Sequence, residues 1–196
     1  MADVTPPHLA DTSVSTASVV IPVSRRRFLK SAALGAMVCA ASPVLASFPE
    51  RRSVSFVHTH TGEHLNAVYF RDGMYDQSTL LRVAYTLRDF RCGAVHTIDP
   101  MLLDALFELQ VRTDQDMPYQ VISAYRSPKT NTMLRSQSHG VAEHSMHLEG
   151  RAIDIRVAGV STKKLRDQAL AMNRGGVGYY PDSDFVHVDT GRVRSW

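Results

Sequence analysis

The chain has 196 residues, of which 44% are hydrophobic and 21% are charged, an ordinary globular composition that excludes collagen-like, low-complexity and wholly disordered proteins. Its 22 Lys and Arg residues and 19 Asp and Glu residues give a formal net charge of +3, too small and too evenly spread to indicate a nucleic-acid-binding protein. A chain of this length is expected to form one domain, here with an N-terminal appendage.

The first 46 residues have the pattern of an export signal. Residues 24–30 read Ser-Arg-Arg-Arg-Phe-Leu-Lys and resemble a twin-arginine signal, and small residues lead up to Ala46, where we expect cleavage. The apolar segment between them, residues 31–42, is shorter than the roughly 20 residues of a membrane span. We therefore expect residues 1–46 to be removed after export by the Tat translocase into the periplasm. A stable membrane anchor is not expected, and a retained anchor is the alternative.

Residues 47–196 are the predicted mature domain. With about 150 residues this domain can bury a conventional core without disulfides. Cys39 lies in the signal, so Cys92 has no partner for an intramolecular disulfide and is expected to be structural.

The hydrophobic patterns of this domain predict, in chain order, a hairpin, two helices, a buried strand, a short third helix, another strand, a fourth helix and a final hairpin. The corresponding segments are residues 53–60 with 65–70, then 78–90, 99–109, 119–125, 128–134, 152–157, 161–172, and 175–180 with 185–189. Asp99 (before a proline) and Ser161 are the expected N-caps of two of the helices. After the first hairpin, helices come first and strands cluster late. This order predicts an α+β fold with a small, largely antiparallel sheet and packed helices.

Two histidines and an aspartate are candidate ligands of a metal, although their spacing alone does not decide it. Asp154 lies between isoleucines in a predicted strand, where a carboxylate is costly unless it is paired or bound to a metal. His147 precedes it along the chain, and His187 lies in the last predicted strand. Two histidines and one carboxylate form a ligand set of catalytic zinc sites, which leave the fourth position to water. The alternative is structural, with the same side chains hydrogen-bonded in half-buried pockets and no metal.

Four segments and the terminal tryptophan resemble the LAS-type zinc peptidases, a family of D-alanyl-D-alanine carboxypeptidases, dipeptidases and murein endopeptidases. The spacing Ser-x-His-x-x-Gly-x-Ala-x-Asp at residues 145–154 is similar to the family signature, and Ser-Ala-Tyr-Arg-Ser at residues 123–127 is similar to a family segment upstream of it. Residues 175–181, residues 185–191 and the terminal Trp196 resemble the YcbK-like branch of murein endopeptidases more closely. The resemblance spans essentially the whole mature chain.

This resemblance implies a fold like that of the hedgehog domain and the DD-peptidases. It also implies that His147, Asp154 and His187 bind Zn²⁺ and that Arg126 holds or polarises the substrate near the scissile carbonyl.

The identity of the catalytic carboxylate is open. In better-known members of the wider family the acid that takes a proton from the zinc-bound water lies three positions before the last histidine ligand, a place held here by Asp184. Asp189 shares a strand face with His187 and is the preferred candidate, although it could equally orient that histidine. His144 and Tyr180 are the expected substrate contacts, with a solvated loop histidine and a packing tyrosine as alternatives.

The expected activity is hydrolysis of peptide cross-links in peptidoglycan, including direct 3–3 bridges between diaminopimelate residues. A D,D- or L,D-carboxypeptidase of the same fold is one alternative, because only the shape of the pocket would separate the two activities. A cell-wall binding module that has lost catalysis is the other.

Overall fold

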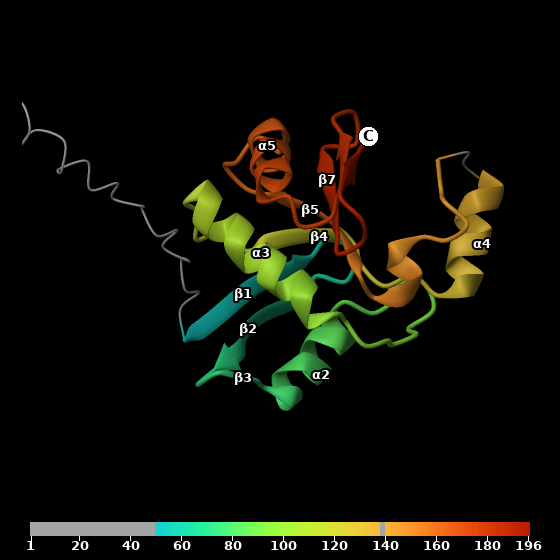
Figure 1. The fold of residues 1–196 in the computed structure, drawn as a ribbon. Helices are drawn as coiled ribbons and strands as arrows, with labels where there is room; N and C mark the ends of the chain where they lie inside the picture. The colour runs from blue at the N-terminus through green and yellow to red at the C-terminus, as the bar shows by residue number, and fades with distance from the viewer. Residues whose placement is uncertain (1–49, 138–139) are drawn as a thin grey trace, which may run out of the picture. The chain divides into compact units, whose positions relative to one another are not determined.

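The computed structural model describes residues 50–137 and 140–196, which belong to one compact unit, Ser47–Trp196 (Figure 1). The predicted signal at residues 1–46 lies outside the described residues. Among the helices that the structure describes, none is long and apolar enough to cross a membrane.

The described residues form one mixed sheet of eight strands in the order β3-β2-β1-β4-β5-β7-β6-β8. The strands are β1 (Arg51–His58), β2 (His64–Arg71), β3 (Met74–Tyr75), β4 (Tyr119–Ser123), β5 (Ala152–Val157), β6 (Gly176–Tyr180), β7 (Phe185–Asp189) and β8 (Arg194–Ser195). Among these described strands only the β1–β4 and β6–β8 pairs are parallel. The predicted α+β class with a largely antiparallel sheet is confirmed. The sheet is larger than expected because β1 pairs with β4 and so joins the N-terminal hairpin to the C-terminal strands.

The helices of the described ranges are α2 (Gln77–Thr86), α3 (Pro100–Thr113), α4 (Pro128–Gln137), the 3₁₀ helix η1 (Met146–Glu149) and α5 (Thr162–Met172). Asp99 and Ser161 cap α3 and α5 as predicted, each accepting a hydrogen bond from a backbone N–H of the first turn. The first predicted helix ends early, at Thr86, and the chain then turns so that the buried Asp89 can bind Ser127. The 3₁₀ helix η1 lies between the predicted segments 128–134 and 152–157, where no element was predicted.

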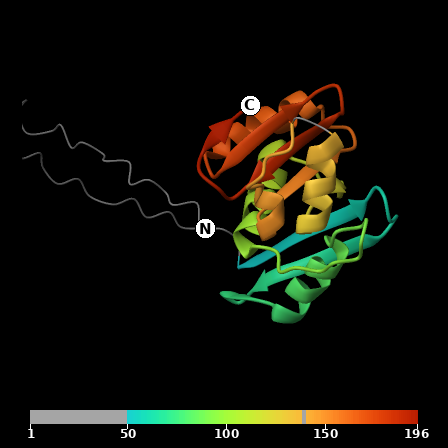
Figure 2. The ribbon, with the colours of Figure 1, turned by 90° about the vertical axis from the view of Figure 1, so that its right-hand side faces the viewer.

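The hydrophobic core lies between one face of the sheet and the helices α2, α3 and α5. Ile153 and Ile155 of β5 point into this core and are fully buried. Because side chains alternate along a strand, Asp154 between them points to the opposite face. Figures 1 and 2 both show η1, in orange, beside the yellow α4. His147 of η1 and Arg126, just before α4, are the residues from this region that approach Asp154.

Candidate metal centre

Three side chains from separate elements converge on the sheet face opposite the core. Asp154 on β5 and His187 on β7 are direct neighbours in the antiparallel register of the two strands. His147 arrives from η1, which begins at the N-cap Ser145 and ends at Gly150 with φ 65°, a left-handed conformation that glycine adopts without strain. One potential ligand atom from each of the three residues lies within 4.8 Å of the other two, and all three residues are buried.

The outer hydrogen bonds of the two histidines decide which of their nitrogens face one another. His147 Nδ1 lies 2.6 Å from the backbone oxygen of Ala124, which can only accept, so Nδ1 carries the proton and Nε2 presents a lone pair. His187 Nε2 lies 3.0 Å from Asp189 Oδ2 and donates to it, so His187 Nδ1 presents a lone pair as well. Both lone pairs face Asp154 Oδ1, which is 3.2 Å from His147 Nε2 and 2.8 Å from His187 Nδ1.

With both histidines in these neutral tautomers, His147 Nε2, Asp154 Oδ1 and His187 Nδ1 are all acceptors, so either a shared proton or a metal cation must lie between them. A zinc ion fits this donor set, because neutral imidazole nitrogens and a carboxylate oxygen are its usual ligands and each histidine is oriented by an outer hydrogen bond. The cluster could therefore hold a metal ion, and its hydrogen bonds are also those of the structural alternative without a metal.

The pKa shifts of the same three residues are compatible with a cation site. Burial alone would raise the pKa of Asp154, but the adjacent His147 and His187 hold the pKa of its carboxyl far below the ordinary value. Burial lowers the pKa of His147, which keeps it neutral. Burial would also lower the pKa of His187, but hydrogen bonds to Asp154 and Asp189 raise it above the ordinary value. Asp154 and Asp189 thus favour a proton on His187, and a bound metal ion would supply the positive charge in place of that proton.

Arg126 is tied to the candidate ligands His147 and Asp154 at both its backbone and its side chain. Its Nη2 donates to Asp154 Oδ2 at 2.7 Å, and its Nε donates to Ser123 Oγ at 3.1 Å. Its backbone N–H donates to the backbone oxygen of His147. The guanidinium therefore fixes the second oxygen of the aspartate ligand, and it lines the pocket in front of the three ligands.

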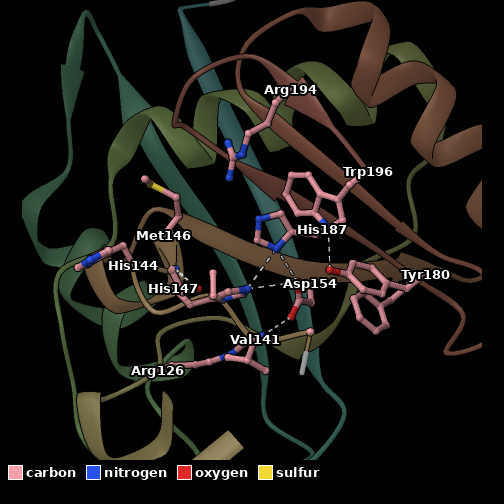
Figure 3. A pocket seen from close by; sticks show the side chains of 14 residues that line it. Arg126, Val141, His144, Met146, His147, Asp154, Tyr180, His187, Arg194 and Trp196 are labelled. Atoms are coloured by element: carbon pink, nitrogen blue, oxygen red, sulfur yellow. Dashed lines mark hydrogen bonds and ion pairs between the residues drawn. The ribbon is translucent and has the colours of Figure 1, made fainter. Parts of the chain in front are cut away.

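The pocket over the ligands has a volume of about 420 Å³ and an aromatic wall formed by Tyr180, Phe185 and Trp196 (Figure 3). Tyr180 stacks on Phe185 with ring centroids 4.5 Å apart, and its hydroxyl oxygen accepts a hydrogen bond from Trp196 Nε1 at 2.7 Å. His144 also lines the pocket, but it is exposed, and Figure 3 shows its ring directed away from His147.

The two candidate catalytic carboxylates take different places, and neither lines this pocket. The Asp189 side chain is fully buried on the far side of the His187 ring, and its two oxygens accept from backbone N–H groups, His187 and Arg194. Asp184 lies in the turn after β6, where its exposed carboxylate pairs with Arg156 at 3.4 Å.

The sequence analysis missed Arg194, which lines the pocket and makes an ion pair with Asp189. An arginine five positions after an aspartate carries no signal by itself. The nearest indication in the sequence is the group of glycines at positions 175, 176 and 178, and only the folded chain shows what requires them.

Comparison with known proteins agrees with the geometry. A family model described as peptidoglycan L,D-endopeptidase MepK matches residues 46–196. The peptidoglycan L,D-endopeptidase MepK of Escherichia coli (strain K12) is 41% identical over 177 residues, which cover 88% of this chain and 97% of that protein. The probable peptidoglycan L,D-endopeptidase MepK of Haemophilus influenzae is 40% identical over 153 residues, covering 78% of this chain and 82% of that protein.

Proposed function

The chain belongs to the MepK family of peptidoglycan L,D-endopeptidases, and on this basis we propose that it is a zinc-dependent murein endopeptidase that hydrolyses peptide cross-links of peptidoglycan. The bonds include the direct 3–3 bridges between diaminopimelate residues. The observation that carries the zinc dependence is the convergence of His147 Nε2, Asp154 Oδ1 and His187 Nδ1 as three acceptors.

A zinc ion held by these three atoms supplies a Lewis acid and a bound water whose pKa is lowered to about 7. Arg126 has two tasks in this arrangement. Through Nη2 it keeps the Asp154 carboxylate in one orientation, and from its place in the pocket it donates to the carbonyl oxygen of the scissile amide. Tyr180 on the aromatic wall and His144 at the rim contact the peptide stems on either side of that bond.

We assign Asp189 to the orientation of His187. Its oxygens are already occupied by five donors, and the His187 ring separates it from the point where the ligand atoms converge. Asp184 is held by Arg156 beside a different hollow, so we assign the proton transfer to neither carboxylate.

The remaining proposals concern the cellular setting. Residues 1–46 act as a twin-arginine signal, so the Tat translocase exports the chain and the mature domain works in the periplasm without a stable membrane anchor. The substrate is the polymer of the cell wall, and no nucleic acid takes part.

The test is mass spectrometry of muropeptides after incubation of purified sacculi with the zinc-loaded protein, with and without chelator. Chelator-sensitive loss of cross-linked dimers, with matching monomers, is expected for the wild type and for the exposed control His64→Ala, and not for His147→Ala. Intact dimers with shortened monomer peptides would instead identify the protein as a carboxypeptidase. Sacculi that are bound and left unchanged would identify a binding module.

A further inference from the structure

The C-terminal end of the chain forms one side of the metal centre. Strand β8 pairs in parallel with β6, so that Arg194 lies opposite Gly176. Trp196 continues this pairing: its N–H donates to the oxygen of Val177 at 3.3 Å, and its oxygen accepts from the N–H of Tyr179 at 3.0 Å. The last three residues are thus fixed by the sheet.

Arg194 clamps the carboxylate that orients His187. Its Nη2 donates to Asp189 Oδ2 at 2.6 Å and its Nη1 donates to Asp189 Oδ1 at 3.1 Å. Such two-pronged arginine–carboxylate pairs restrict both the position and the plane of the carboxylate. Because Asp189 Oδ2 also accepts from His187 Nε2, the guanidinium fixes the ring of a metal ligand through one intermediate group.

Trp196 restricts the same ring directly. The centroid of its indole lies 5.2 Å from that of His187, and its Nε1 is held by the hydroxyl of Tyr180 (Figure 3). The Arg194 guanidinium lies 4.9 Å from the indole centroid, within the range of a cation–π contact. Arg194 and Trp196 therefore support each other as well as His187.

Two glycines of β6 make room for these side chains. A methyl group on Gly176 would overlap the Arg194 guanidinium and lie 2.5 Å from Asp189 Oδ2. A methyl group on Gly178 would lie 2.7 Å from the Trp196 ring. Glycine weakens a strand, so its use at two alternate positions of one face is explained by the approach of the C-terminal segment.

A contribution to the core does not explain this arrangement. The Arg194 side chain is 30% exposed and Trp196 is 51% exposed, and both line the pocket instead of the core between sheet and helices. We propose that residues 194–196 are a positioning element for the ligand His187, with Arg194 acting through Asp189 and Trp196 acting through ring contact. This inference rests on the metal centre of the proposed function and adds residues that set its metal affinity.

The test measures zinc affinity of the full chain by competition with a chromogenic chelator, in the absence of any substrate. Arg194→Gln is expected to weaken zinc binding by about 10- to 100-fold, the usual effect of removing a group that orients a metal ligand. Arg194→Lys is expected to recover part of the loss, because it keeps the charge beside Asp189 but makes one hydrogen bond instead of two. The matched control is Arg192→Gln, since Arg192 is an exposed arginine of the same segment.

Trp196→Ala provides a second variant at a half-exposed position, and it is also expected to weaken zinc binding. The thermal midpoints of the metal-free variants separate loss of positioning from loss of folding. Zinc affinity of both Arg194→Gln and Trp196→Ala within twofold of the wild type would overturn the inference. A wild type that binds zinc tightly but leaves cross-linked dimers intact would overturn the proposed function and not the positioning role.

Discussion

The buried carboxylate of Asp89 is expected to stabilise the segment that carries Arg126, in a pH-dependent way. Its Oδ2 accepts from the N–H of Ser127 at 2.9 Å and from Ser127 Oγ at 2.7 Å, and its Oδ1 accepts from the N–H of Arg91 at 3.1 Å. Burial would raise the pKa of Asp89, but hydrogen bonds from Thr130 and Ser127 outweigh it and lower the pKa to about 2. Because both oxygens of Asp89 accept hydrogen bonds, the NH₂ group that Asp89→Asn introduces must face a donor on one side, where it cannot accept.

The size of this stabilisation follows from the difference between the pKa of Asp89 in the folded chain and in the unfolded chain. A group whose pKa is about 2 in the folded chain and 3.8 in the unfolded chain contributes about 2 kcal/mol to the free energy of unfolding. The unfolded chain binds the proton more tightly, so this contribution is fully present above about pH 4 and is lost as the pH falls through 2.

The assay is urea unfolding of the wild type and Asp89→Asn between pH 7 and pH 2.5. The difference in free energy of unfolding between the two proteins isolates Asp89 from the other buried carboxylates. We expect the wild type to be more stable by about 2 kcal/mol or more at pH 7, and the difference to shrink by about 1.5 kcal/mol at pH 2.5. A difference that stays constant over this range would refute the assignment of Asp89 as an ionised, hydrogen-bonded anchor.

Three further predictions concern the metal and its surroundings. Asp154→Ala is expected to lose stoichiometric zinc, measured by elemental analysis after dialysis, and an unchanged zinc content would contradict the ligand set. Co²⁺ is expected to quench the emission of Trp196, the single tryptophan of the chain, because its ring lies 5.2 Å from His187, whereas Mg²⁺ should not; full emission at saturating Co²⁺ would place the metal elsewhere. Gly178→Ala is expected to lower kcat/KM for cross-linked dimers by on the order of tenfold or more, since the added methyl displaces Trp196, and an unchanged value would show that the indole is dispensable.

Local patterns predicted the elements that depend on local chemistry. The caps Asp99 and Ser161 lie where the sequence places them, because a side chain that binds its own first turn needs no distant partner. The structure also brings together the three predicted ligands His147, Asp154 and His187. Asp154 could be singled out because a carboxylate between two isoleucines is costly without a partner.

The partners of the carboxylates could not be predicted in the same way. Asp189 lies on the far side of His187 with Arg194 as one of its partners, and the parallel pairing of β6 with β8 brings Arg194 there. The early end of α2 also involves a distant partner, because Asp89, just after the helix, binds Ser127 at a separation of 38 residues. In both cases a non-local hydrogen bond decides the conformation, and neither periodicity nor spacing records it.

The two histidines of the proposed metal centre are held in one tautomer by different means. His147 Nδ1 donates to the backbone oxygen of Ala124, and because a carbonyl never donates, the lone pair on His147 Nε2 is fixed by the fold itself. His187 depends on a side chain instead: its Nδ1 lone pair is fixed only while Asp189 remains ionised and in place. Burial would raise the pKa of Asp189, but His187, Arg194 and two backbone N–H groups hold the pKa well below its ordinary value. The extra donors around Asp189, which His147 does not need, follow from this difference, and Arg194 on β8 supplies two of them.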